Sequence, residues 1–218
     1  MAVAILILAH NNPQNLTKLV ESMDSDKYNF YIHIDKKVDI SLYKQDLISF
    51  KNVMFLTQRF TVSWGGGNMI KATNELLRIA LENQQNNLYQ LVSGNDIYVE
   101  PTDSIFQPIV KSLPSWYILN SKVNQLEFNY KIDKWFFGDG IFSRKDGFAL
   151  SIFIARILAI IISFLFKKNH SDIEYIKGSQ WWCISKDMAL LILSHESRNT
   201  GLYKNLKYSM CPDEILYH

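Results

Sequence analysis

The sequence predicts an α/β fold in which helices cover a mostly parallel central sheet. Over the first two-thirds of the chain, apolar runs of strand length alternate with segments of helical periodicity. This alternation is typical of βαβ units, which place their strands in parallel. Polar residues follow several of the expected strands, and ligands bind outside the carboxyl ends of such strands. The alternation therefore also indicates where a site is expected.

The expected elements follow one another in a regular order. Residues 3–9 form a continuous apolar run, as in a buried parallel strand. Pro13 is expected to begin the first helix, with Asn12 as its N-cap. Further strands are expected at 30–34, 53–57, 88–92 and 116–119, and helices at 69–81, 103–113 and 186–193.

Composition excludes several classes of protein. The chain has 218 residues, 48% of them hydrophobic, which is enough for one large domain with its own core. A net charge of +2 gives no broad electrostatic footprint for nucleic acid. Cys183 and Cys211 fit neither a disulfide framework nor a zinc site, so we expect free thiols. The apolar N-terminus has no basic residues before it, which favours a buried strand over a signal peptide.

Polar side chains cluster where three expected strands end. His10, Asn11 and Asn12 follow the first strand, Asp35 follows the second, and Asn95-Asp96 follows the fourth. Asp35 could accept hydrogen bonds from a ribose or a base. His33 shares its strand face, so metal ligation is conceivable, and a solvated strand end is the alternative. No Asp-x-Asp occurs at either place, which argues against a divalent cation that bridges a diphosphate.

A glycine-rich segment, Ser63-Trp64-Gly65-Gly66-Gly67, precedes the helix expected at 69–81. Glycines let a backbone approach a ligand closely, and the helix N-terminus that follows favours an anion such as phosphate. The segment is not a P-loop, because no Gly-Lys-Ser/Thr follows it. A flexible turn is the alternative interpretation.

Two aromatic segments are candidates for sugar binding. Gly178-Ser179-Gln180-Trp181-Trp182 combines an open backbone, an amide and two indoles, and aromatic rings stack on the apolar faces of sugars. A core strand anchored by at least one tryptophan is the alternative. Lys134 and Trp135 lie in a second, less specific cluster with Lys131 and Asp133.

The tetrapeptide Cys211-Pro212-Asp213-Glu214 places two carboxylates directly after a proline. Proline is favoured in the first turn of a helix, so both carboxylates are expected in that turn. A carboxylate held there can act as a general base if its surroundings tune its pKa. It can equally be an ordinary charge that pairs with the helix dipole.

Residues 148–166 are almost wholly apolar, with Arg156 as their single charge. As a helix they would be roughly 30 Å long, enough to span a bilayer. Arg156 near the middle would cost about 2.5–3.5 kcal/mol on insertion. Ala155, Arg156, Ala159, Ser163 and Lys167 fall on one narrow, weakly polar stripe. A spanning helix, an in-plane membrane-docking helix and a helix buried in a core or dimer are the alternatives.

Taken in order, six of these segments resemble the core-2/I-branching glycosyltransferase family, which includes peptide xylosyltransferases (glycosyltransferase family 14). They are 9–13, 31–37, 62–66, 91–96, 178–182 and 211–214. Each segment alone is weak evidence, but six in order are specific. The resemblance implies a GT-A type fold and an inverting transfer from a nucleotide sugar, usually a UDP-sugar. The family dispenses with the Asp-x-Asp metal site, so no cofactor or metal is expected.

The resemblance also implies roles for individual residues. Glu214 would be the general base that deprotonates the acceptor hydroxyl. The expected nucleotide-sugar residues are Leu8, Ala9, His10, Asp35, Ser63, Trp64, Gly65 and Asp96. The expected acceptor or sugar residues are Gly178, Ser179, Gln180, Trp181, Trp182, Lys134 and Trp135.

One catalytic domain is expected over 1–218, with a nucleotide-binding half, 1–120, and an acceptor-side half, 121–218. In the family, basic residues after the Pro-Asp-Glu motif stabilise the leaving diphosphate. This sequence stops at His218, so we expect a truncated C-terminal part or a substitute cation. A single crossing at 148–166 would separate Asp96 from Glu214, which argues against the spanning helix.

The resulting hypothesis is a metal-independent transferase that builds a bacterial surface polysaccharide. It would be cytoplasmic and peripheral to the inner face of the membrane, and its acceptor would be a glycan or a lipid-linked glycan. The apolar helix would bind the membrane surface or form a homo-oligomer. Two other hypotheses remain open. One is a catalytically inactive module that binds a nucleotide sugar or glycan, and the other is a metal-dependent GT-A transferase that uses Asp96 and His33.

Overall fold

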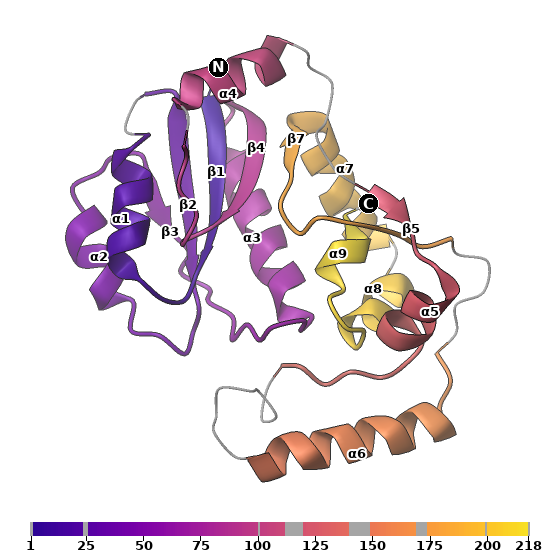
Figure 1. Cartoon of the computed structure of the whole chain (residues 1–218). Helices are drawn as coiled ribbons and strands as arrows, with labels where there is room; N and C mark the ends of the chain where they lie inside the picture. Colours follow the sequence, from indigo (N-terminus) through magenta and orange to yellow (C-terminus); the bar gives the residue numbers. More distant parts are fainter. Residues whose placement is uncertain are drawn as a thin grey trace. The chain divides into compact units, whose positions relative to one another are not determined.

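The computed structural model describes residues 2–23, 26–99, 101–111, 120–139, 149–168, 174–198 and 200–217 (Figure 1). The chain forms two compact units. Unit 1 comprises Met1–Arg59, Ala72–Ile118 and Trp181–Ser194, and unit 2 comprises Phe60–Lys71, Leu119–Gln180 and His195–His218. These boundaries differ from the expected halves, since residues 60–71 belong to unit 2 and 181–194 to unit 1. That the two form one catalytic domain stays a prediction.

Unit 1 is built on a five-stranded sheet. Its strands are β1 (Ala2–Ala9), β2 (Tyr28–Ile34), β3 (Val53–Phe55), β4 (Asn86–Ser93) and β7 (Cys183–Ser185). The order is β3-β2-β1-β4-β7; the first four strands are parallel, and β7 is antiparallel to β4. This mostly parallel sheet confirms the predicted fold class.

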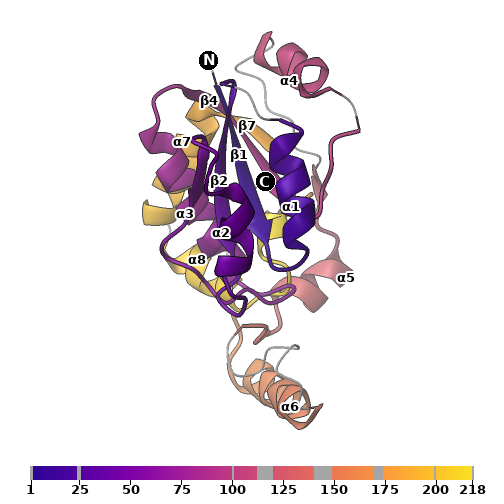
Figure 2. The same cartoon turned by 90° about the vertical axis from the view of Figure 1, so that its left-hand side faces the viewer.

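Helices cover both faces of the unit 1 sheet. They are α1 (Pro13–Glu21), α2 (Ser41–Leu47), α3 (Asn68–Glu82), α4 (Thr102–Lys111) and α7 (Lys186–Arg198), and the unit boundary falls within α3 and α7. Figure 2 shows α1 and α2 on one face, with α3 and α7 on the other. On α4, Asp103 accepts a hydrogen bond of 3.2 Å from the hydroxyl of Tyr28, which ties that helix to the beginning of β2.

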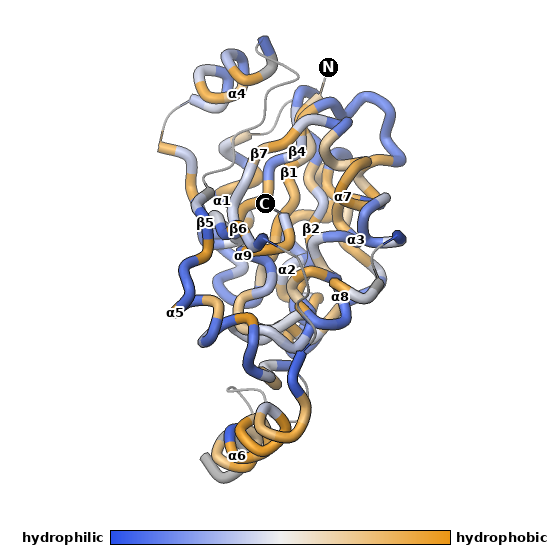
Figure 3. Tube along the Cα trace, turned by 90° about the vertical axis from the view of Figure 1, so that its right-hand side faces the viewer, coloured by the Kyte–Doolittle hydropathy of each residue, from blue (hydrophilic) through white to orange (hydrophobic). Residues whose placement is uncertain are grey.

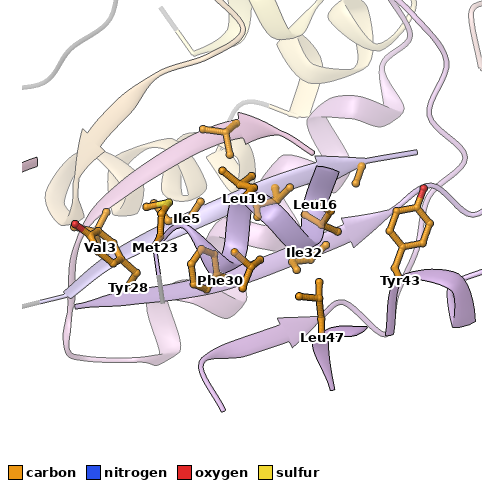
Figure 4. Packing of buried hydrophobic residues seen from close by; sticks show 14 of the residues in the cluster. Val3, Ile5, Leu16, Leu19, Met23, Tyr28, Phe30, Ile32, Tyr43 and Leu47 are labelled. Carbon is orange, nitrogen blue, oxygen red and sulfur yellow. The ribbon is translucent and has the colours of Figure 1, made fainter. Parts of the chain in front are cut away.

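The core of unit 1 lies between β1, β2 and the helices α1 and α2. Ile5 and Phe30 project from neighbouring strands, and Leu16 and Leu19 of α1 pack over them (Figure 4). All four side chains are fully buried. Burial of one such side chain stabilises a fold by about 1.5–3 kcal/mol. The continuous apolar run of β1 is therefore explained by burial on both faces of the sheet.

A buried amide joins β4 to its neighbours. Asn86, the first residue of β4, is completely buried, and its Nδ2 donates to the Tyr31 hydroxyl at 2.9 Å and to the Ala80 carbonyl at 2.8 Å. Its Oδ1 accepts from Nδ2 of Asn29 at 2.8 Å. Three hydrogen bonds satisfy an amide that would be costly to bury alone. Asn86 therefore fixes where β4 begins.

Unit 2 is smaller and less regular. Its elements are β5 (Asn120–Lys122), α5 (Gln125–Glu127), the π-helix η1 (Phe128–Ile132), α6 (Ala149–Leu165), β6 (Ile176–Gly178), α8 (Thr200–Lys207) and α9 (Asp213–Leu216). The strands β5 and β6 pair antiparallel. A small core of Ile132, Tyr175, Leu206 and Ile215 joins η1, α8 and α9.

Lys168 anchors the end of the α6 segment within unit 2. Its Nζ donates to the carbonyls of Ile132 and Tyr208 at 2.8 and 2.9 Å, and to the Ser209 hydroxyl at 2.9 Å. Burial lowers the pKa of Lys168 to about 8, against the opposing charge of Asp133. An ammonium group with three acceptors is satisfied in spite of its burial.

Most of the expected elements are confirmed, and the differences lie at one helix cap, one strand end and several short elements. Asn12 precedes α1, but its side chain makes no capping hydrogen bond. It adopts a left-handed conformation, with φ 50°, and its Nδ2 donates to Asn95 instead at 3.2 Å. The third strand ends at Phe55 rather than at residue 57, and the strand expected at 116–119 lies outside the described residues. Seven further elements lie where none was expected: α2, β5, α5, η1, β6, β7 and α8.

The apolar segment forms α6, a helix of 17 residues, and Figure 3 shows it as almost continuously hydrophobic. Among the described residues, no helix has the length and apolar character that a membrane crossing requires. The helix confirms the secondary structure expected for the segment.

Replacement of Asn86 by alanine tests the role of the buried amide. We expect Asn86→Ala to lower the free energy of unfolding by about 2–3 kcal/mol, because it leaves buried partners unsatisfied. Asn87→Ala is the matched control. Within the part of the chain that the structure describes, the Asn87 side chain bonds only to the neighbouring Gln85 carbonyl at the surface, so its loss should cost less than about 1 kcal/mol. Urea denaturation measures both, and equal losses would contradict the assignment.

Candidate functional site

In unit 1, the carboxyl end of β1 lies between the ends of its two neighbours. The carbonyl of Ala9 accepts from the Asp35 amide at 2.9 Å, and the carbonyl of Leu8 accepts from the Gly94 amide at 2.9 Å. A Cβ on Gly94 would lie 2.6 Å from the Ala9 Cβ, so only glycine fits there. The predicted nucleotide-side residues of the three strands are thus brought together.

Asp35 is held in the turn that follows β2. Its side chain is 6% exposed, and its Oδ1 accepts from the Lys37 amide at 2.9 Å. The Lys37 ammonium lies 3.7 Å from its Oδ2. Arg59 stabilises the same turn, because its guanidinium donates to the Val38 carbonyl at 2.9 Å. A buried carboxylate beside a cation, at the end of a parallel strand, suits an acceptor of hydrogen bonds from a nucleoside.

The residues after β4 form an exposed polar loop. Asp96 Oδ2 accepts from the Ser93 amide at 2.8 Å, which closes the turn. Asn95 bridges to the β1 end, donating to Asn11 at 2.7 Å and accepting from Asn12 at 3.2 Å. His33 is buried within β2. The described part of the chain contains no group of three His, Cys, Asp or Glu residues that could hold a metal ion.

In unit 2, the glycine segment surrounds a carboxylate of the protein itself. Asp139 accepts from the Ser63 amide at 3.0 Å and from the Asn68 amide, at the start of α3, at 2.6 Å. A Cβ on Gly66 would lie 2.3 Å from the Asp139 side chain. The anion at this helix N-terminus is therefore Asp139, which satisfies helix N–H groups that otherwise lack partners. Nucleotide-sugar binding by Ser63, Trp64 and Gly65 stays a prediction.

The Cys211–Glu214 segment adopts the predicted helix start. Cys211 has a left-handed conformation, with φ 51°, and its amide donates to the Gly65 carbonyl at 3.0 Å. Pro212 is the N-cap of α9, and Asp213 and Glu214 form its first turn. The sharp turn at Cys211 and the fixed φ of Pro212 thus position both carboxylates.

Glu214 forms an ion pair with Lys131 of η1. Lys131 Nζ lies 2.9 Å from Glu214 Oε2, and the two side chains are 25% and 34% exposed. Burial lowers the pKa of Lys131, but the hydrogen bond and charge of Glu214 outweigh burial, and the net pKa is raised. Lys131 is therefore a stable positive charge beside a carboxylate that solvent, and hence a substrate, can reach.

Asp213 differs from its neighbour in exposure. It is 4% exposed, and burial raises the pKa of its carboxyl to about 6, with backbone N–H groups acting in the opposite direction and the nearby Glu214 charge adding to the rise. The Cys211 thiol is also buried, which raises its pKa to about 11. Cys183 and Cys211 are both free thiols, as expected.

The two tryptophans of the 178–182 segment have different environments. Trp182 is 1% exposed, and its carbonyl accepts from the Leu91 amide at 3.0 Å, so it is the expected core anchor. Trp181 is 37% exposed. Gly178 ends β6 opposite Asn120. Trp181 and Trp182 belong to unit 1, and Gly178, Ser179 and Gln180 belong to unit 2. Their sugar-binding role stays a prediction.

Trp135 lies at a cavity of about 460 Å³ within unit 2. Its indole stacks against Phe137 with 6.4 Å between ring centroids, and its Nε1 donates to the Phe166 carbonyl at 2.7 Å. Lys134, Arg156 and Trp64 also line the cavity. The predicted acceptor residues Lys134 and Trp135 thus border an aromatic cavity, and their sugar-binding role stays a prediction.

Sequence reasoning missed the partners of the motif residues. Lys131 and Asp139 pair with groups 83 and 71–76 positions away, and no local pattern relates such positions. The place of Arg156 at the cavity could have been suspected from the sequence, because Arg156 is the only charged residue of the apolar helix α6.

The comparisons with known proteins agree with the resemblance to the core-2/I-branching family. The family profile described as Core-2/I-Branching enzyme matches residues 3–218. Xylosyltransferase sqv-6 of Caenorhabditis briggsae is 22% identical over 98% of this chain. The chain spans 25% of the length of that relative.

Two solved structures resemble the chain more weakly. A 4-diphosphocytidyl-2C-methyl-D-erythritol synthase from Anaerococcus prevotii has a TM-score of 0.43 at 9% identity, covering 91% of this chain and 77% of its own. Another 4-diphosphocytidyl-2C-methyl-D-erythritol synthase has a TM-score of 0.45 at 6% identity, and the match covers 100% of this chain and 93% of the synthase. The family profile, which spans nearly every residue, shows that the chain belongs to the core-2/I-branching enzyme family of glycosyltransferases.

Proposed function

We propose that the chain is an inverting, metal-independent glycosyltransferase that moves a sugar from a UDP-sugar to a hydroxyl group of an acceptor glycan. The observation that carries this proposal is the Glu214 carboxylate, which α9 holds in its first turn beside Lys131. Family membership supports the transfer of a sugar. The xylosyltransferase relative leaves the choice between a pentose and a hexose open.

Exposure distinguishes the two carboxylates of the motif. A general base must reach the proton that it removes, and the Glu214 side chain is 34% exposed. Asp213 is buried in the α9 turn, where it has no access to an acceptor. We therefore assign the base to Glu214 and a structural role to Asp213.

The proposed reaction is a single displacement. Glu214 removes the proton of the acceptor hydroxyl, whose oxygen forms a bond to the anomeric carbon of the donor. The bond from that carbon to the diphosphate oxygen breaks, and the nucleoside diphosphate leaves with both electrons. One base on one face and one leaving group on the other give inversion. The Lys131 ammonium holds the Glu214 carboxylate in position before the proton moves.

The donor is expected at the strand ends of unit 1. Leu8 and Ala9 would line the base pocket, and Asp35 would accept hydrogen bonds from the nucleoside. His10 and Asp96 would complete the donor side. This assignment is supported by the backbone hydrogen bonds that join the ends of β1, β2 and β4. A role in bacterial surface polysaccharide synthesis, at the inner face of the membrane, remains part of the proposal.

The α6 helix supports docking on a membrane. Its small residues face its own unit, since Ala155 is buried and the Ser163 hydroxyl accepts from the Trp135 amide at 3.0 Å. Eight large apolar side chains are each at least 39% exposed: Phe153, Ile154, Ile157, Leu158, Ile160, Ile161, Phe164 and Leu165. At 100° per residue they cover about 160° of the helix.

The breadth of this apolar face favours lipid over a second copy of the chain. Helix pairs bury a narrower stripe, whereas a lipid phase covers a broad convex face. Lys167 lies at one edge of the face, where anionic headgroups would meet it. We therefore propose that α6 lies in the plane of an anionic membrane.

Substitution of Glu214 tests the base. We expect Glu214→Gln to lower turnover of a UDP-sugar panel with an acceptor glycan by about 10²–10⁴-fold, because the hydroxyl loses its proton acceptor. Release of UDP, measured in EDTA, is the readout, and calorimetry with UDP should show unchanged donor binding. Glu21→Gln, an exposed carboxylate at the end of α1, is the matched control.

Three results would count against this assignment. Full turnover in Glu214→Gln would remove the base from this position. UDP binding without any turnover in the unsubstituted chain would favour the inactive binding module. A strict requirement for Mn²⁺ would favour the metal-dependent alternative.

The pH dependence of stability tests the burial of Asp213. The folded pKa of Asp213, about 6, exceeds its unfolded value of 3.8. The contribution of this carboxyl to the free energy of unfolding is therefore fully present below pH 3.8 and is lost as the pH rises through about 6. The difference corresponds to about 3 kcal/mol. We expect Asp213→Asn to be more stable than the parent by about 1–3 kcal/mol at pH 8 and equally stable near pH 4. The free energy of unfolding is measured by urea denaturation at several pH values, with Asp46→Asn, an exposed carboxylate, as the control. Parallel pH profiles of the parent and Asp213→Asn would contradict the raised pKa of Asp213.

Flotation with vesicles tests the α6 face. We expect the protein to float with vesicles that contain 30% phosphatidylglycerol, and Ile160→Ser/Phe164→Ser to weaken binding at least about tenfold, because each side chain buries in lipid. Ile48→Ser removes an equally exposed apolar residue from unit 1 and should have no effect. Absence of flotation, together with a doubled mass in light scattering, would favour self-association.

A further inference from the structure

The transfer of a sugar does not by itself account for one cavity within unit 2. It has a volume of about 460 Å³ and lies between the 134–138 segment and α6. Its aromatic walls include Trp64, Trp135 and Phe137, and Ala155 and Ala159 give it a smooth apolar wall on the α6 side. These residues form what we call the α6 cavity.

The α6 cavity also carries two positive charges. Lys134 and Arg156 both line it, and Arg156 is the single charged residue of an otherwise apolar helix. Among the described residues, neither has a carboxylate at ion-pair distance. An Arg guanidinium binds a phosphate through two parallel hydrogen bonds, and Lys adds a point charge. The cavity therefore combines an anion-binding edge with apolar and aromatic walls.

Backbone contacts connect the α6 cavity to the loop that carries Glu214. Met210 lines the cavity, and its amide donates to the Lys131 carbonyl at 2.8 Å. Lys131 in turn pairs with Glu214. Trp64 lines the same cavity and precedes Gly65, whose carbonyl accepts from Cys211. A ligand in this cavity would thus lie next to the segments that position the Glu214 carboxylate.

A free sugar would use only part of this cavity. Aromatic rings can stack on a sugar, but two cations and an apolar helix wall have no partner on a neutral glycan. The opposite face of α6 is the broad apolar face, so an apolar chain could pass from the cavity along the helix toward lipid. A phosphate with an apolar chain matches both the charges and the walls.

We propose that the α6 cavity binds the phosphate and the first part of the apolar chain of a lipid-phosphate-linked acceptor. This proposal rests on the proposed transfer, because it names the acceptor class of that reaction. Lys134 and Arg156 bind the phosphate, and Trp135, Phe137, Ala155 and Ala159 contact the chain. The sugar carried by the lipid would then extend toward Glu214.

Direct binding tests the proposal without any turnover. Farnesyl phosphate, kept below its micelle concentration, is titrated against the full chain, with tryptophan fluorescence as the readout, since Trp64 and Trp135 line the cavity. We expect it to bind at least tenfold more tightly than farnesol, which lacks the anion, and than inorganic phosphate, which lacks the chain. Methyl β-D-glucuronide represents an anionic sugar and should not compete.

Variants locate the binding. Arg156→Gln and Lys134→Gln should each weaken farnesyl phosphate about tenfold and leave farnesol unchanged, because only the phosphate loses a partner. Lys71→Gln, an exposed lysine of unit 2 outside the cavity, is the matched control. Ile160→Ser/Phe164→Ser removes the outer apolar face and should leave binding in the cavity intact.

Three outcomes would overturn the proposal. They are equal affinity for farnesol and farnesyl phosphate, no effect of Arg156→Gln, and displacement of the probe by the glucuronide. Failure here is distinct from failure of the proposed function. Turnover with a soluble glycan and no farnesyl phosphate binding would reject only the acceptor class, whereas probe binding without UDP binding or turnover would reject the transferase.

Discussion

The ion pair between Lys131 and Glu214 is the interaction on which the proposed chemistry depends. It joins η1 to α9 across 83 residues of sequence, and backbone hydrogen bonds support it from both sides. The Met210 amide donates to the Lys131 carbonyl, and the Cys211 amide donates to Gly65. Unit 2 therefore fixes the Glu214 carboxylate through main-chain contacts, which would preorganise the proposed base at low entropic cost.

The glycine segment takes part in the same arrangement. Gly67 packs against the backbone of Lys207, where a Cβ would lie 2.6 Å from the carbonyl oxygen. Gly66 leaves room for Asp139, and Gly65 adopts the left-handed conformation, with φ 71°. The three glycines thus allow close packing against Cys211, Asp139 and Lys207, a role that the sequence pattern of a phosphate-binding loop does not indicate.

Sequence reasoning succeeded where the signal is local or periodic. The apolar run of β1, the amphipathic pattern of α3 and the Pro212 helix start each depend on a few neighbouring residues, and each is confirmed. The short strands β6 and β7 carry too few residues for a periodic signal.

The partners of the site residues are a different case. The pairs Lys131–Glu214 and Asp139–Ser63 depend on tertiary contacts that no spacing rule encodes. Asn12 shows the same effect at one position, because contact with Asn95 replaces the capping bond that its propensity predicts.

A double-mutant cycle on Lys131 and Glu214 tests the central claim most directly. Turnover is measured for Lys131→Met, for Glu214→Gln and for the double variant, and the three losses are compared. If Lys131 acts by holding the base, its replacement lowers turnover only while Glu214 is present, and the double variant is no slower than Glu214→Gln alone. Losses that multiply in the double variant would contradict the account.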